Sequence, residues 1–347
     1  MKISVLITGK IRNKYIFKYL LSNYILLRDH GIVDEIIISG WEADYESEAI
    51  DINELSLQGI KHILTHEPNA FYSPGHLIHQ LKAIKQALPH INPENFIFKT
   101  RTDIVPEFEK LPALFSNVIN ARPIYGTHNT FRRRIWVTHF EFFVPFWISD
   151  LVIMAQWADM ESMIRYDFEY EIMGDIPSKG AVPNPEIRHF LPIFEQPFPL
   201  LREYRKVWPL MHINNSNYCR DLINFLEKDI YLEYLSLYYY IIDTHFLVGT
   251  DAYPGEMRLL RKSGENWYLQ NAYPASSHDD STNFSEKINK LSQGNIFSPT
   301  PNSKLIRSIL NREDLNSIAL SLTAKHLSSA LAYKNTSKRM SDLLSIF

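Results

Sequence analysis

The alternation of short apolar runs with helical patterns in the first hundred residues constrains the fold more than any other feature of the chain. Four continuous apolar runs are typical of strands covered on both faces, at residues 3–8, 35–39, 60–64 and 96–99. Between them, apolar residues recur at helical spacing over residues 15–28 and 77–88. Alternating strands and helices predict an α/β fold with a mainly parallel sheet flanked by helices.

The pattern is looser beyond residue 120. Residues 135–144 predict one or two strands. Helices are predicted over residues 151–157, after Ser149 and Asp150, over residues 187–194, after Pro185 and Glu186, and over residues 217–246. A stretch rich in Ser, Asn, Asp and Pro predicts a linker, and two short helical patterns follow it. We therefore expect an α/β domain over residues 1–275, a linker over 276–302 and a helical C-terminal segment over 303–347.

Composition excludes several classes of function. The single cysteine, Cys219, rules out an intramolecular disulfide and a cysteine-based zinc site. A net charge of −3 argues against a nucleic-acid-binding protein. The first apolar run ends at Lys10, too early for a signal peptide, and no stretch has the apolar length of a membrane helix. We expect a cytoplasmic protein.

Charge is divided unevenly along the chain. Residues 281–347 hold nine basic and four acidic residues, a net of +5, which leaves −8 for the rest of the total of −3. Apolar residues at helical spacing accompany these charges. The segment is therefore predicted to contact the inner membrane face or a partner there. The alternatives are a helical cap on the catalytic domain and a contact between copies of the chain in a homo-oligomer.

Candidate binding residues follow the predicted strands, because ligands of open α/β sheets bind at the carboxyl ends of the strands. They are Gly9, Lys10 and Arg12 after the first strand, Trp41 after the second, and Arg101 and Asp103 after the fourth. Gly9 has turn geometry as its alternative explanation, and Trp41 has a place in the core.

The fourth strand runs into Lys99-Thr100-Arg101-Thr102-Asp103. In an extended chain Lys99, Arg101 and Asp103 project to the same side, so Lys99 is a further candidate donor-binding residue. A carboxylate just beyond a strand can hold Mg²⁺ or Mn²⁺, and an arginine beside it can bind phosphate through its planar fork. Alternatively, Arg101 and Asp103 pair with one another.

Several short blocks, taken in order, resemble the WavE-type lipopolysaccharide synthesis proteins over roughly residues 1–190. The blocks are Ile7-Thr8-Gly9-Lys10, Ile38-Ser39-Gly40-Trp41, His79-Gln80 with Ala87-Leu88, Phe98-Lys99-Thr100-Arg101-Thr102-Asp103, Phe146-Trp147-Ile148-Ser149-Asp150-Leu151, and Pro185-Glu186. The resemblance implies a glycosyltransferase-like α/β fold of the GT-A kind that binds a nucleotide-sugar donor. It places the R-x-D where such enzymes carry a D-x-D metal motif, so Mg²⁺ or Mn²⁺ on Asp103 is the cofactor implied, with metal dependence left open.

Three further positions have a functional and a structural interpretation. Sugar transfer with inversion needs a carboxylate to take the acceptor proton, and Glu186 or Asp150 could supply it. Both also stand where a helix start is predicted, at which a carboxylate is stabilising without any catalytic role. Gln80 could contact the base of the donor or join its helix to the sheet. The run Arg132-Arg133-Arg134 could be a solvated face or attract an anionic ligand.

The sequence thus predicts a glycosyltransferase that moves a sugar to a saccharide or lipid-linked saccharide acceptor of a bacterial lipopolysaccharide or capsule. Asp103 would hold the diphosphate, with or without a divalent ion. Lys10, Arg12 or Arg101 would neutralise the leaving nucleotide. The alternatives are nucleotidyl or phosphoryl transfer on a similar fold and a non-catalytic partner in a polysaccharide assembly complex.

Overall fold

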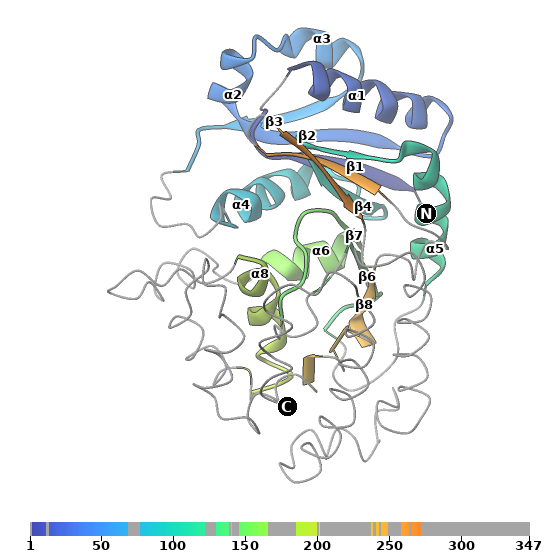
Figure 1. Cartoon of the computed structure of the whole chain (residues 1–347), viewed down its shortest axis with the longest axis vertical. Helices are drawn as coiled ribbons and strands as arrows, with labels where there is room; N and C mark the ends of the chain where they lie inside the picture. Colours follow the sequence, from blue (N-terminus) through green and yellow to red (C-terminus); the bar gives the residue numbers. More distant parts are fainter. Residues whose placement is uncertain are drawn as a thin grey trace.

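The computed structural model describes residues 2–11, 14–68, 77–121, 130–138, 140, 146–165, 185–199, 201, 237–238, 241–242, 244–248, 258–263 and 266–271. Its main feature is a seven-stranded sheet in the order β3-β2-β1-β4-β7-β6-β8 (Figure 1). The strands are β1 (Ile3–Thr8), β2 (Glu35–Trp41), β3 (Lys61–Thr65), β4 (Phe96–Arg101), β7 (Ile153–Gln156), β6 (Ile135–Val137) and β8 (Phe246–Val248).

The four strands predicted in the first hundred residues are confirmed, and they pair in parallel. β1 lies between β2 and β4, β3 follows β2, and β7 runs antiparallel between β4 and β6. Every residue of β1 is buried, as expected for a strand covered on both faces. The predicted α/β fold with a mainly parallel sheet flanked by helices is therefore confirmed.

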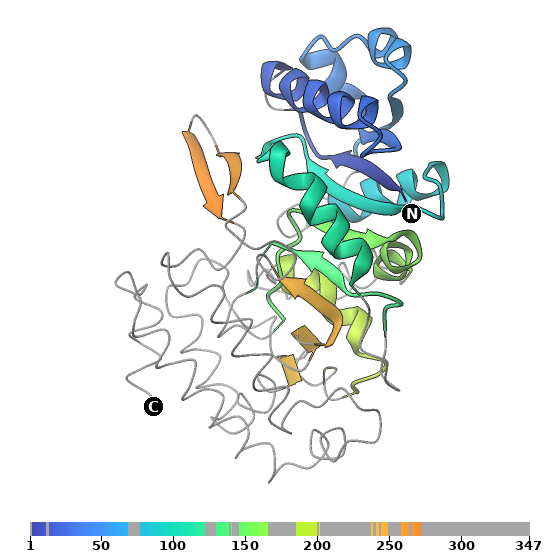
Figure 2. The ribbon, with the colours of Figure 1, turned by 90° about the vertical axis from the view of Figure 1, so that its right-hand side faces the viewer.

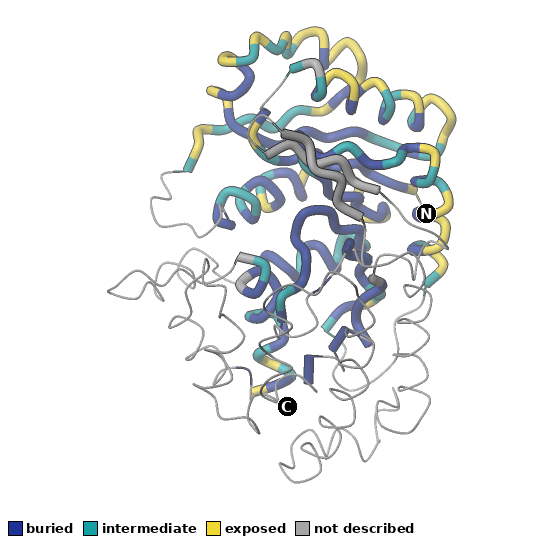
Figure 3. Tube along the Cα trace, viewed as in Figure 1, coloured by how far each residue is buried: buried dark blue, intermediate teal, exposed yellow. Residues whose placement is uncertain are grey.

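Helices cover both faces of this sheet. In Figure 1, α1 (Lys14–Asp29), α2 (Glu42–Ser47) and α3 (Ile52–Leu57) lie on one side, and α4 (Leu77–Ala87), α6 (Trp157–Ile164) and α8 (Pro185–Phe194) lie on the other. α5 (Leu111–Asn120) packs into the same apolar core as α1, and two short 3-10 helices, η2 (Leu88–His90) and η3 (Phe108–Lys110), lie beside α4 and α5. The strands are buried, while the outer turns of α1 and α3 face solvent (Figure 3).

Helix α1 shows how the local sequence sets the element boundaries. Its buried face is Phe17, Leu20, Leu21, Tyr24 and Leu27, at the spacing of one helical stripe. The helix ends at Asp29, and Gly31, two residues further on, has a φ of 72°, which suits a residue without Cβ. Its amide donates to the Arg28 carbonyl at 2.8 Å, and the next amide donates to the Leu27 carbonyl at 2.9 Å. These bonds satisfy carbonyls of the last turn and direct the chain back into β2.

A second, three-stranded sheet begins where β4 ends. β5 (Ile104–Pro106) pairs antiparallel with β9 (Arg258–Ser263), which pairs with β10 (Asn266–Asn271). Figure 2 shows the β9–β10 hairpin, in orange, to one side of the main sheet. The chain thus passes from one sheet to the other at Thr102 and Asp103, so the R-x-D motif lies at their junction.

Two predicted helices are wrong in whole or in part. Residues 153–156 of the predicted helix over 151–157 form strand β7, and α6 begins only at Trp157. The apolar run is too short to separate helix from buried strand by periodicity, and pairing with β4 decides it. Likewise, Phe246 begins strand β8 instead of ending the predicted helix over 217–246, of which only a few residues are described. The short helices α2 and α3 were not predicted.

Candidate active site at the carboxyl edge of the sheet

The carboxyl ends of β1 and β4 meet at the point where the strand order reverses. Thr8 is in register with Arg101. The Thr102 amide donates to the Thr8 carbonyl at 3.0 Å, and its hydroxyl donates to the Lys10 carbonyl at 2.5 Å. Between them Gly9 has a φ of 97°, so its turn geometry explains the glycine. In open α/β sheets this switch point is where ligands bind.

Arg101 and Asp103 form a two-pronged ion pair at this edge. Arg101 Nε donates to Asp103 Oδ1 and its Nη2 donates to Oδ2, both at 2.8 Å. The Asp103 side chain is 4% exposed and the Arg101 side chain 17%. Burial would lower the pKa of Arg101, but attraction to Asp103, with smaller contributions from Asp150 and Glu186, raises it. The fork of Arg101 is therefore fixed in position by Asp103.

This pairing bears on the divalent ion predicted at Asp103. Both carboxylate oxygens already accept from Arg101. Within the described part of the chain, no group of three or more His, Cys, Asp or Glu side chains is placed to hold a metal ion. A role for Mg²⁺ or Mn²⁺ at Asp103 stays a prediction, and no step below depends on it.

Lys99 lies on the same face of β4 as Arg101, two residues before it, and is fully buried. Its ammonium donates to the Gln80 Oε1 at 3.1 Å and to the carbonyls of Asp150 and Leu151 at 2.6 and 3.3 Å. Burial lowers the pKa of Lys99 to about 8, and Asp150 acts against that shift. Three acceptors thus hold the buried ammonium of Lys99. Through these bonds Lys99 joins α4 to the segment that leads into β7.

Gln80 and Asp150 belong to this same network. The Gln80 amide nitrogen donates to Asp150 Oδ2 at 3.0 Å. Gln80 therefore joins its helix to the sheet, the structural one of its two predicted interpretations. Asp150 is 2% exposed and precedes strand β7, so the helix start expected there is wrong. Its carboxylate takes part in an internal network.

Glu186 lies in the first turn of α8, where a helix start was correctly predicted, and it is only partly buried. Its charge contributes to the raised pKa of Arg101, as do the charges of Asp103 and Asp150. Three carboxylates predicted from the sequence, which together span more than eighty residues of the chain, therefore act on one guanidinium. Among these three, Glu186 is the one left accessible.

Two residues of this edge were missed by the sequence analysis. Asp44, in α2, is 3% exposed and lies 3.5 Å from the ammonium of Lys10, whose side chain is 62% exposed. His189 follows Glu186 by three residues on α8, so both lie on one face of that helix. The rule that identified Arg101, residues just after a strand, would have found Asp44, and helical spacing from Glu186 would have found His189.

The His189 ring is fully buried, stacks on Phe190 with centroids 4.6 Å apart, and has no hydrogen-bond partner for either nitrogen within the described residues. Burial lowers the pKa of His189 to about 4, against the attraction of Asp150. The unfolded chain therefore binds a proton between about pH 6.5 and 4 that the folded chain does not. Stability contributed by neutral His189 is complete above pH 6.5 and is lost as the pH falls through this window.

We expect His189→Phe to be at least as stable as the wild type at pH 7, because it removes two buried ring nitrogens that have no hydrogen-bond partner among the described residues. Its stability should fall less on acidification, by about 1.4 kcal/mol per pH unit between pH 6.5 and 4. Urea unfolding at pH 7 and pH 5 measures both quantities. The other twelve histidines are common to both proteins. An identical pH dependence would show that His189 is accessible to protons in the folded state.

Two remaining predicted residues are placed differently. Trp41 ends β2, is 4% exposed and packs edge-to-face on His79 with centroids 5.9 Å apart, which is a place in the core. Arg12 lies outside the described residues, as do residues 276–347, for which a linker and a helical segment were predicted. The described chain has no helix long and apolar enough to cross a membrane.

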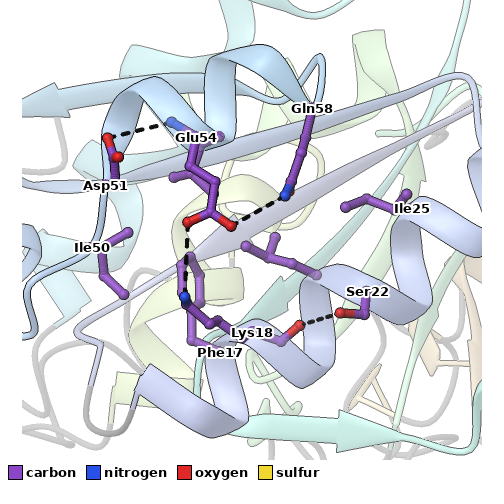
Figure 4. Close-up of a pocket in the computed structure, with 10 residues that line it drawn as sticks. Phe17, Lys18, Ser22, Ile25, Ile50, Asp51, Glu54 and Gln58 are labelled. Carbon is purple, nitrogen blue, oxygen red and sulfur yellow. Dashed lines mark hydrogen bonds and ion pairs between the residues drawn. The ribbon is translucent and has the colours of Figure 1, made fainter.

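A hollow between α1 and α3 is a poor candidate for a site (Figure 4). It encloses about 110 Å³, and all five of its polar side chains already have partners. Glu54 pairs with Lys18 at 3.8 Å and accepts from Gln58 at 3.5 Å, Asp51 caps α3, and Ser22 donates to a backbone carbonyl. Among the described residues that line it, no convergent polar group is left to orient a ligand.

Comparisons with known proteins give no family assignment. No family model and no curated protein matches the chain. Among solved structures, the chain is similar to a crystal structure of S. aureus TarS, residues 1–349, with 10% sequence identity and a TM-score of 0.33. The match covers 77% of this chain and 99% of that one. A TM-score this low is too weak to support an argument about function.

Proposed function

We propose that this protein is a glycosyltransferase that moves a sugar from a nucleotide-sugar to a saccharide or lipid-linked saccharide acceptor of a bacterial lipopolysaccharide or capsule. The observation that supports it best is the charged cluster around Arg101 at the switch point of a mainly parallel sheet. The order of the sequence blocks from Ile7 to Glu186 agrees with it. The identity of sugar and acceptor rests on the family resemblance.

Arg101 and Lys10 are the groups we assign to the leaving nucleotide diphosphate. Charge develops on that group as the glycosidic bond breaks, and fixed cations stabilise it most when they need not reorganise. Arg101 meets this condition because Asp103 holds its fork at two points. Asp103 then acts through Arg101 as a positioning residue. A divalent ion bound with the diphosphate could supply further positive charge, and metal titration of the activity would test that.

Glu186 is the group we assign as general base, in preference to Asp150. A base must reach the acceptor hydroxyl within hydrogen-bond distance. Asp150 is 2% exposed and its carboxylate accepts from Gln80. Glu186 is partly accessible at the start of α8 and close enough to Arg101 to affect its pKa. In this assignment, Asp150 has a structural role in the hydrogen-bond network with Gln80 and Lys99 next to the carboxyl edge of the sheet.

Calorimetric binding of a panel of nucleoside diphosphates, followed by product analysis with the matching nucleotide-sugar and an acceptor glycan, tests the proposal. We expect one nucleoside diphosphate to bind preferentially and its sugar to appear on the acceptor. Transfer of the nucleotidyl or phosphoryl group would assign the alternative enzyme class. Tight binding without turnover would favour a non-catalytic partner. Binding of none of the panel would remove the basis of the proposal.

A further inference from the structure

The three consecutive arginines that follow residue 131 have separate environments in the structure. Arg133 Nη1 donates to the Ile119 carbonyl at 2.7 Å, and its guanidinium lies 5.6 Å from the centroid of the Phe96 ring. Arg134 is partly buried. Arg132, in contrast, has an exposed side chain that lines a surface pocket. The run is therefore not one uniform charged face, and Arg132 has a distinct setting.

Asp159 holds the backbone from which the Arg132 side chain extends. Its carboxylate oxygens accept from the amides of Arg132 at 2.6 Å and of Arg133 at 3.0 Å. The side chain belongs to α6 and is 1% exposed. Because these bonds reach backbone amides, they survive substitution of the Arg132 side chain. Asp159 also lines the pocket, and the two amide bonds partly offset the negative charge of its carboxylate there.

Donors from two segments meet in this pocket of about 460 Å³. The residues before β6 contribute Thr130 and Arg132, and the C-cap of α6 contributes Arg165. Ser162 also lines the pocket, but its hydroxyl donates to the Ala158 carbonyl at 2.9 Å. The Thr130 hydroxyl is shielded from solvent and has no hydrogen-bond partner within the described residues. The volume lies in the range of small-molecule sites. Two guanidinium groups and the Thr130 hydroxyl form a donor set of the kind that recognises oxyanions.

The pocket lies at the amino edge of the parallel strands, away from Arg101. Its first segment immediately precedes β6, which runs in the same direction as β4 because both are antiparallel to β7. α6 starts beside the beginning of β4, where the Trp157 amide donates to the Asn95 carbonyl at 3.2 Å. A six-residue strand spans roughly 20 Å, so the two edges can hold different ligands at once.

We propose that this pocket binds an oxyanion group, a phosphate or a carboxylate, carried by a saccharide. The volume favours a substituted sugar over an isolated inorganic anion, and this choice of carrier rests on the proposed function. The proposal that the pocket binds an oxyanion is independent of the proposed function. Glu161 pairs with Arg165 at 2.7 Å and is the competing anion. Both side chains of that pair are exposed, and such pairs contribute little, so a ligand can replace it.

The test measures binding of inorganic phosphate by the full chain with and without saturating nucleoside diphosphate. Arg132→Ala and Arg165→Ala should each weaken binding by about tenfold, which corresponds to loss of a charge-assisted hydrogen bond of about 1.4 kcal/mol. Glu161→Gln should strengthen binding, because it removes the competing carboxylate. Lys18→Ala is the matched control, since Lys18 is an exposed cation paired with a glutamate on the opposite face of the sheet. Lys18→Ala should leave phosphate binding unchanged.

The outcomes separate this inference from the proposed function. Displacement of phosphate by nucleoside diphosphate would overturn the proposal that this pocket binds an oxyanion. Unchanged phosphate binding in both arginine variants would also overturn it. Weaker binding in Glu161→Gln would overturn it as well. A second arm compares inorganic phosphate with a sugar phosphate and a uronic acid. Tighter binding of either sugar supports the saccharide carrier, and equal or weaker binding of both overturns that part. A chain that transfers no sugar but loses phosphate binding in Arg132→Ala would contradict the proposed function alone.

Discussion

Asp103→Asn is expected to reduce the rate of sugar transfer by about a hundredfold and to lower the stability of the fold by about 3 kcal/mol. The amide keeps the size of the carboxylate but not its charge, and only one of its two terminal atoms can accept from Arg101. A buried ion pair that loses one partner leaves the other charge uncompensated, which costs about 3–5 kcal/mol. A guanidinium displaced by about 1 Å can cost a hundredfold in rate.

The double variant Arg101→Gln/Asp103→Asn separates the two effects. Two amides can hydrogen-bond to one another without a buried charge, so much of the lost stability should return. The rate should not return, since the cation that faces the diphosphate is gone. Calorimetric binding of the nucleoside diphosphate, thermal unfolding and turnover are measured on all three proteins. Asp103→Asn with wild-type activity would remove Asp103 from the site. A rate loss with unchanged stability and altered metal dependence would instead favour Asp103 as a metal ligand.

The strands of the first half could be predicted because each contains a short apolar run bounded by turn residues. β1 and β4 are each six residues long and almost fully buried, as expected for strands covered on both faces. β7 has only four residues, and its apolar run fits a helix equally well. Its conformation is set by pairing with β4, a contact more than fifty residues away in the chain. Local pattern contains no information about that contact.

The residues of the candidate site also fall into two groups, those that local sequence pattern predicts and those that depend on long-range contacts. Arg101 ends β4, and Asp103 and Lys10 come just after strands, so the rule for the carboxyl edge identifies all three. Asp44 follows β2 by three residues and lies in an unpredicted six-residue helix, so that rule was not extended to it. The role of Asp150 depended on whether residues 153–156 are helix or strand. As the start of a helix it would have been a cap, whereas beside β7 it accepts from Gln80 and its carbonyl accepts from Lys99.

His189 and Lys99 show what a sequence leaves undetermined even when the element is right. α8 was predicted, yet nothing in its pattern shows that His189 is fully buried or that its ring nitrogens have no hydrogen-bond partner in the described part of the chain. Lys99 was expected to project toward the ligand with Arg101. The structure instead gives its ammonium three internal acceptors. Both results depend on how α4 and α8 pack against the sheet. That packing is a property of the assembled fold.

Glu186→Gln is expected to be nearly inactive while it binds the donor as the wild type does. The amide keeps the size and hydrogen-bonding geometry of the side chain but cannot accept the proton of the acceptor hydroxyl. Loss of a general base costs about 10²–10⁴-fold in rate. Because Glu186 is partly exposed, its neutralisation should leave thermal unfolding nearly unchanged. Calorimetric donor binding, unfolding and turnover are measured side by side.

Asp150→Asn is the matched comparison for this variant. Its carboxylate is buried and accepts from Gln80, so the amide should lower stability measurably and reduce the rate through a disturbed edge. The pH–rate profile distinguishes the two roles. Glu186→Gln should lose the acidic limb of the profile, since that limb reports ionisation of the base, whereas Asp150→Asn should keep it at a reduced height. If Glu186→Gln keeps both its rate and its acidic limb, the base is another group, and loss of the limb in Asp150→Asn would assign it to Asp150.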